Sequence, residues 1–165
     1  MMIASRIKVS AAVLICTGAW NLPIAALVFP APAMAQAASQ LSDESAAAAQ
    51  VVRDYYAALN AGDYARAHAL WADGGAASGK SLAEFTQGFA HTRSTAAQIV
   101  SVSAPEGAMG SEFVTVAVDV HATLDNGAPQ HFTGNYTVRR VNGVPGATAA
   151  QLNWHIGAAS LHPAH

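Results

Sequence analysis

The sequence contains very little cysteine, and this scarcity limits the chemistry available to the chain. Cys16 is the only cysteine among 165 residues, and it lies in an N-terminal segment that we expect to be cleaved. The mature chain then has no disulfide, no thiolate nucleophile and no cysteine-based metal site. Its stability must come from packing, which a domain of about 130 residues can achieve.

Charged side chains are also scarce, and basic ones are outnumbered. They make up 11% of the chain, with eight Lys and Arg against ten Asp and Glu. Domains that bind nucleic acid need a basic face, so we expect no nucleic-acid partner. The sequence also lacks an H-E-x-x-H motif and a phosphate-binding glycine loop. We therefore expect no metal and no cofactor.

The N-terminal segment has the features of a secretory signal peptide. A basic start with Arg6 and Lys8 precedes an apolar stretch, and Ala33-Met34-Ala35 supplies the small-x-small pattern that signal peptidases accept. An uncleaved membrane anchor is the alternative, but one asparagine and three prolines interrupt the apolar run. We predict cleavage after Ala35 and no membrane association afterwards. The alanine-rich composition suggests a bacterial protein, so we expect it in the periplasm or secreted from the cell.

Three helices are predicted in the first half of the mature chain. Ser42 is a good N-cap, and the apolar residues after it recur with the period of an amphipathic helix, which Gly62 ends. Asp63 can cap a second helix. Ser81-Leu82-Ala83-Glu84 is a capping box that begins a third helix, which we expect to end near His91.

The second half alternates apolar and polar residues, which is typical of half-buried strands. Asp125-Asn126-Gly127 predicts a hairpin turn, and a three-residue loop there would place His121 opposite His131. Helices followed by strands indicate an α+β fold, with three helices on one face of an antiparallel sheet of about four strands. The expected division of the chain is a signal peptide at 1–35, a flexible tail at 36–41, the α+β domain at 42–161 and a C-terminal tail at 162–165.

Residues 52–71 carry a resemblance to a known family. The stretch Val52-Arg-Asp-Tyr-Tyr-Ala-Ala-Leu-Asn-Ala-Gly-Asp-Tyr-Ala-Arg-Ala-His-Ala-Leu-Trp71 resembles the opening helix pair of the nuclear transport factor 2-like superfamily, which includes ketosteroid isomerase-like and polyketide cyclase-like proteins. The resemblance implies a cone, with a pocket between the concave face of a bent sheet and the first and third helices. Members include enzymes and binding proteins, so the fold does not decide the function.

Aromatic residues are concentrated on the apolar faces of the predicted elements. They can pack a core, or they can line a pocket for a small ligand. The second interpretation predicts an exported module that binds a small apolar ligand, or that associates with a partner, for example as a homodimer through its sheet. The residues predicted to line the pocket are Tyr55, Tyr56, Trp71, Phe89, Tyr136 and Trp154.

An enzyme is the alternative to a binding module. A small-molecule isomerase, dehydratase or cyclase needs acid and base groups aimed at one spot, and Asp54, His91 and either Tyr55 or Tyr136 are the candidates. Few acidic residues are expected to face the inside of the cone. This scarcity favours the non-enzymatic role.

Histidines supply one further pattern. The predicted hairpin places His121 and His131 on the same strand face as Asp119, and we expect His155 on that face as well. Two histidines and a carboxylate can bind a metal ion. This face is expected to point outward, however, so we interpret the residues as a polar sheet surface.

Overall fold

A computed structural model describes residues 31–164 of the protein, with side chains from residue 43 onward. Most of the predicted signal peptide, residues 1–30, therefore lies outside the described residues. None of the helices in the described range is both long enough and apolar enough to cross a membrane.

The first helix, α1 (Ala31–Asn60), is longer than its sequence signals predict. It begins well before Ser42, so residues 36–41 belong to a helix and the predicted flexible tail is wrong for the full chain. The cause lies in the composition: residues 33–60 contain no proline and no glycine, and their commonest residue is alanine, the best helix former. Gly62 ends the helix as predicted, and its positive φ of 70° suits glycine.

Three short helices follow: α2 (Tyr64–Ala69), the 3-10 helix η1 (Asp73–Ser78) and α3 (Leu82–Gly88). The side chain of Asp63 caps α2 by accepting a backbone N–H at 3.0 Å. Ser81 and Glu84 form the predicted capping box at the start of α3. This helix ends before His91, because the chain already enters the sheet at Thr92.

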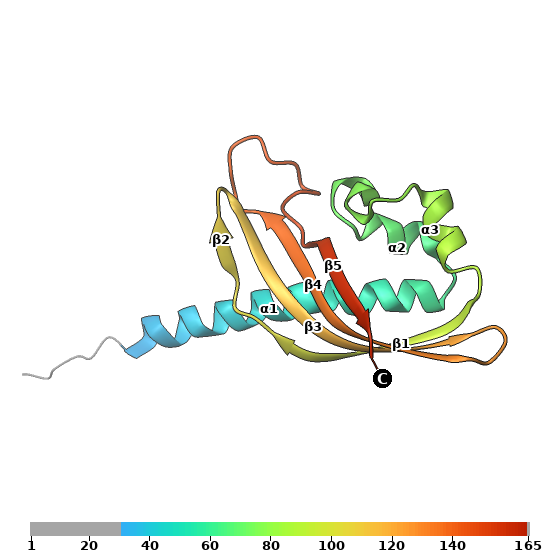
Figure 1. Cartoon of the computed structure of the whole chain (residues 1–165). Coiled ribbons are helices and arrows are strands. Elements are labelled where there is room, and N and C mark those ends of the chain that lie inside the picture. The colour runs from blue at the N-terminus through green and yellow to red at the C-terminus, as the bar shows by residue number, and fades with distance from the viewer. Residues whose placement is uncertain (1–30, 165) are drawn as a thin grey trace, which may run out of the picture. The chain divides into compact units, whose positions relative to one another are not determined.

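The five strands form one open antiparallel sheet. Their order is β1-β3-β4-β5, and β2 pairs with the start of β3. The predicted α+β arrangement is confirmed. Figure 1 shows α1 crossing the sheet, with α2 and α3 beside its C-terminal half. The strands are β1 (Thr92–Val102), β2 (Glu106–Ala108), β3 (Ser111–Leu124), β4 (Pro129–Val141) and β5 (His155–Pro163).

The last strand extends further than predicted. His162 pairs with Thr133 of β4, and the N–H of Ala164 donates to the carbonyl of His131 at 2.9 Å. The predicted C-terminal tail at 162–165 is therefore wrong over its described residues. At the other end, Leu152 lies in the loop before β5 and is 42% exposed. Pairing with β4 determines where β5 begins and where it ends.

The hairpin between β3 and β4 has the predicted register. Backbone hydrogen bonding closes the loop at 125–127, and His121 lies opposite His131. His155 pairs with Arg139 of β4, eight residues along that strand from His131. Its neighbour Ile156 is buried in the core, so alternation places His155 on the outer face, but it does not join the cluster of Asp119, His121 and His131.

The core lies between α1 and the inner face of the sheet. The alternating valines of β3 are buried there, and no side chain in the described core carries a charge. Burial of apolar side chains is the main contribution to stability in such a core. The members of this core in α1 and the sheet include Val52, Tyr55, Tyr56 and Leu59 of α1, Val114, Val116, Val118 and Val120 of β3, Tyr136 and Val138 of β4, and Ile156 of β5.

Arg140 links the middle of α1 to the sheet. Its guanidinium donates to Glu44 of α1 at 2.6 Å and to Glu112 of β3 at 2.7 Å, and it lies 4.8 Å from the centre of the Trp154 ring. Burial lowers the pKa of Arg140, but the hydrogen bonds to the two carboxylates outweigh burial and raise that pKa overall. The three charged groups thus hold the helix against β3 and β4.

Candidate functional site

Tyr55 is the centre of an aromatic cluster between the helices and the sheet. Its ring makes edge-to-face contacts with Tyr56, Trp71, Phe85 and Tyr136, at centroid distances between 5.1 and 6.3 Å. Such pairs contribute about 0.5–1.5 kcal/mol each beyond the burial of their area. The amphipathic stripe of α1 brings Tyr55 to this position, and the cluster holds the ring in one orientation.

A pocket of about 290 Å³ opens beside this cluster, between α1, the end of α3 and the sheet. Its walls are mainly aromatic and aliphatic, and its polar groups are hydroxyls and one amide. The side chains that line it include no carboxylate, imidazole, amine or guanidinium. The lining consists of Tyr55, Tyr56, Gly88, Phe89, Thr92, Thr95, Val120, Ala122, Gln130, Phe132, Tyr136 and Leu161.

Two phenols in the wall of this pocket are hydrogen-bonded to each other. The hydroxyl oxygens of Tyr56 and Tyr136 lie 2.7 Å apart in a buried contact. Burial raises the pKa of Tyr56 to about 12, and it raises the pKa values of Tyr55 and Tyr136 further. The three phenols therefore stay neutral at physiological pH, and they can donate or accept hydrogen bonds but cannot serve as anionic bases.

A second pocket of about 260 Å³ adjoins the first. The two share Tyr55, Gly88 and Phe89, and the second also includes Ser78 and Lys80. The ammonium group of Lys80 is the one charged group in these two linings. An apolar space thus continues from the sheet toward the loop before α3.

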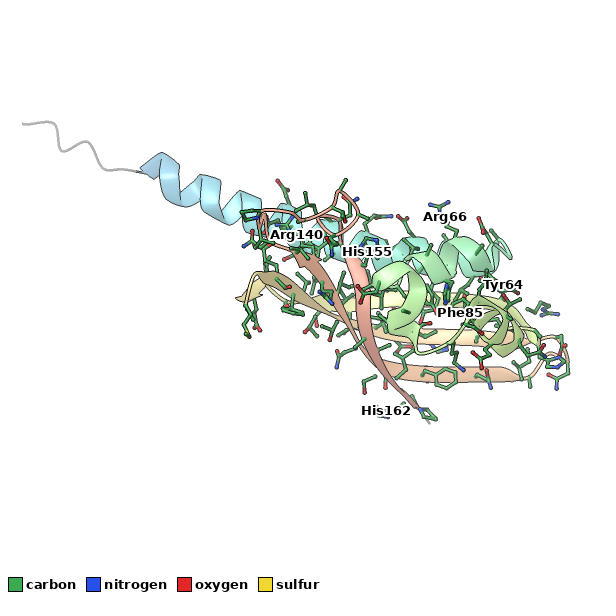
Figure 2. All side chains as sticks on the ribbon, turned by 90° about the horizontal axis from the view of Figure 1, so that it is seen from above. Tyr64, Arg66, Phe85, Arg140, His155 and His162 are labelled. Carbon is green, nitrogen blue, oxygen red and sulfur yellow. The ribbon has the colours of Figure 1, made fainter. Side chains whose placement is uncertain are left out.

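The predicted pocket residues divide into three groups. Tyr55, Tyr56, Phe89 and Tyr136 line the first pocket, and Trp71 lines the second. Trp154 lines neither, because its ring packs against the guanidinium of Arg140. Figure 2 shows Arg140 toward one end of the sheet and Phe85, next to the pockets, toward the other.

Several lining residues were missed by the sequence interpretation. Phe132 had a usable signal, because it stands at the same alternating positions of 132–138 as the buried Tyr136 and Val138. Leu161 lies in the second half of β5, and Thr92 and Thr95 lie at the start of β1. Their positions depend on how long β5 and β1 are, which long-range pairing determines.

The candidate catalytic residues do not converge. Asp54 is half-buried on α1, accepts a hydrogen bond from Gln50 at 2.8 Å, and lines neither pocket. The His91 side chain is 80% exposed, and its Nδ1 lies 2.9 Å from Oδ2 of Asp125. That hydrogen bond lowers the pKa of Asp125. Of the candidates only the two tyrosines, Tyr55 and Tyr136, line a pocket, so the geometry provides no acid–base pair aimed at one point.

Comparison of the chain with protein-family models, with curated proteins and with solved structures finds no match. The resemblance to the nuclear transport factor 2-like superfamily therefore stays a prediction, carried by residues 52–71 and by the order of the elements.

Proposed function

We propose that this protein binds a small, mainly apolar molecule in the pocket between α1, α3 and the sheet. The observation that carries the proposal is the lining of that pocket, which combines aromatic and aliphatic walls with neutral hydroxyl groups. Small-ligand sites typically have this composition: an apolar cavity of about 300–1,000 Å³ with a few placed polar groups. The pocket, at about 290 Å³, lies just below this range.

The chemistry of the lining favours binding over catalysis. General acid–base catalysis needs a group that exchanges a proton near neutral pH. The phenols of Tyr55, Tyr56 and Tyr136 cannot do so, because burial raises their pKa values. They can instead orient a carbonyl or hydroxyl group of a ligand by hydrogen bonding.

The predicted resemblance supports the same location. In the nuclear transport factor 2-like superfamily the implied pocket lies between the sheet and the first and third helices, and α1, α3 and the sheet occupy these positions here. That superfamily includes binding proteins without chemistry. Under this proposal the predicted signal peptide would deliver a ligand-binding module to the periplasm or the exterior.

A fluorescence titration with N-phenyl-1-naphthylamine, a neutral apolar fluorophore, tests the proposal. The Cβ of a side chain at Gly88 would meet no atom within 4 Å, and Gly88 lines both pockets, so Gly88→Leu adds bulk beside them without a clash at its Cβ. Gly107 in β2 has equally free space and lines neither pocket, so Gly107→Leu is the matched control.

We expect the wild type and Gly107→Leu to bind the fluorophore with the same affinity. Gly88→Leu should bind it at least about tenfold more weakly, a loss of about 1.4 kcal/mol. Equal affinity in Gly88→Leu, or no binding by the wild type, would contradict the proposal.

A further inference from the structure

Three potential metal ligands meet on the face of the sheet that points away from the helices. Oδ1 of Asp119 lies 2.8 Å from Nε2 of His131 and 3.1 Å from Nε2 of His121. All three ligand atoms lie within 4.8 Å of one another. One carboxylate oxygen thus stands between two imidazole nitrogens.

The backbone fixes this arrangement. His121 and His131 are cross-strand partners in the β3–β4 hairpin, and their rings stack with centroids 4.2 Å apart and an interplanar angle of 11°. Asp119 lies two residues before His121, so both side chains point to the same face of β3. The alternate residues Val118 and Val120 are buried in the core, which holds the strand in this orientation.

The three side chains are accessible from solvent. Their side-chain exposures are 65% for His121, 33% for His131 and 30% for Asp119. The aromatic pockets lie on the other face of the sheet. A cation can therefore reach the histidine face without entering the domain, and the two sites are independent.

We propose that Asp119, His121 and His131 bind one divalent transition-metal ion of the zinc class. Imidazole nitrogen with carboxylate oxygen is a donor set suited to Zn²⁺, Cu²⁺ or Ni²⁺, whereas Mg²⁺ and Ca²⁺ prefer oxygen ligands alone. Three protein ligands on an open surface leave at least one coordination position for water.

The separations between the carboxylate oxygen and the two imidazole nitrogens need to lengthen by less than about 1 Å to admit the ion. Tetrahedral zinc with bonds of about 2.1 Å separates its ligand atoms by about 3.4 Å. The observed separations of 2.8 and 3.1 Å from the carboxylate are therefore a few tenths of an ångström too short. In the absence of metal Nε2–H of His131 donates to Asp119. When metal binds, the neutral rings carry their proton on Nδ1, and the Nε2 lone pairs face the ion.

The direct test is calorimetric titration of the tag-free protein with Zn²⁺. We expect one ion per chain, and His121→Asn and Asp119→Asn should each weaken binding by at least about tenfold. His91→Asn is the matched control, because His91 is also exposed and also contacts a carboxylate. It does not belong to the cluster of Asp119, His121 and His131. It should bind zinc as the wild type does.

Two results would overturn the proposal. One is the absence of saturable zinc binding by the wild type. The other is unchanged affinity in both His121→Asn and Asp119→Asn, which would mean that other histidines bind the ion. His121 is largely exposed, so its variant folds even if a change at Asp119 disturbs the sheet. Histidine 15N shifts of Nε2 in His121 and His131 give a second readout, and both should move together on addition of zinc.

Discussion

The hydroxyl groups of Tyr56 in α1 and Tyr136 in β4 lie 2.7 Å apart and join the first helix to the sheet inside the pocket wall. Tyr136→Phe removes one partner and leaves the other hydroxyl buried without its hydrogen bond. We expect the free energy of unfolding to fall by about 1–2 kcal/mol, measured by urea denaturation. Tyr64→Phe is the control, because Tyr64 is only partly buried, and its effect should stay within about 0.5 kcal/mol. Equal losses in both variants would contradict the assigned role of the pair.

Alkaline pH should destabilise the fold through the same phenols. Burial raises the pKa of Tyr56 from the ordinary 10.0 to about 12, so the folded state favours the neutral phenol. The resulting stabilisation is fully present below pH 10 and is lost as the pH rises through about 12. Unfolding free energies measured from pH 9 to 12 should decrease, and less steeply in Tyr56→Phe. An identical slope in the variant would count against the buried phenol as the cause.

Arg140 offers a test of how α1 is fixed to the sheet. Arg140→Gln would leave Glu44 and Glu112 facing each other without a cation, and we expect a loss of about 2 kcal/mol in the free energy of unfolding. Arg139→Gln is the neighbouring control. Arg139 is 36% exposed, and its nearest carboxylate, Asp73, is 3.9 Å away, so the loss should be below about 1 kcal/mol. Similar losses of unfolding free energy in the two variants would contradict the role of Arg140 in holding α1 against the sheet.

Gly134 permits the close approach of β4 and β5. A Cβ at this position would lie 2.0 Å from the carbonyl oxygen of Ser160, so Gly134→Ala must displace β5. We expect a loss of about 2–3 kcal/mol in thermal or urea unfolding. Weaker fluorophore binding should accompany it, because Leu161 of β5 lines the pocket. Gly107→Ala, where the added methyl group meets nothing, should be neutral to within about 0.5 kcal/mol. A neutral Gly134→Ala would refute the tight pairing.

The sequence predicts the kind and order of the elements well, because local signals determine them. The change from a helical period to a period of two separates helices from strands, and the capping box at Ser81 and the hairpin at 125–127 are local patterns. The loop length alone was enough to place His121 opposite His131.

The ends of the helices and strands and the shapes of the pockets were harder to predict, because they depend on residues that are distant in the sequence. The cap at Ser42 did not begin α1, since alanine-rich residues before it also favour a helix. The end of β5 depends on its pairing with β4, and no local sequence pattern predicts that pairing. Four of the predicted pocket residues, all tyrosine or phenylalanine, line the pocket because they lie on apolar faces. Trp154 does not line it, because its ring contacts Arg140, which comes from a distant segment of the sequence.

Native mass spectrometry of the protein purified from cells tests the ligand-binding proposal most directly. The wild type and Gly107→Leu should carry a discrete additional mass from a small molecule, and Gly88→Leu should have lost it. Bare protein in all three samples, or the same additional mass in Gly88→Leu, would contradict the proposal that the pocket beside Tyr55 holds a ligand.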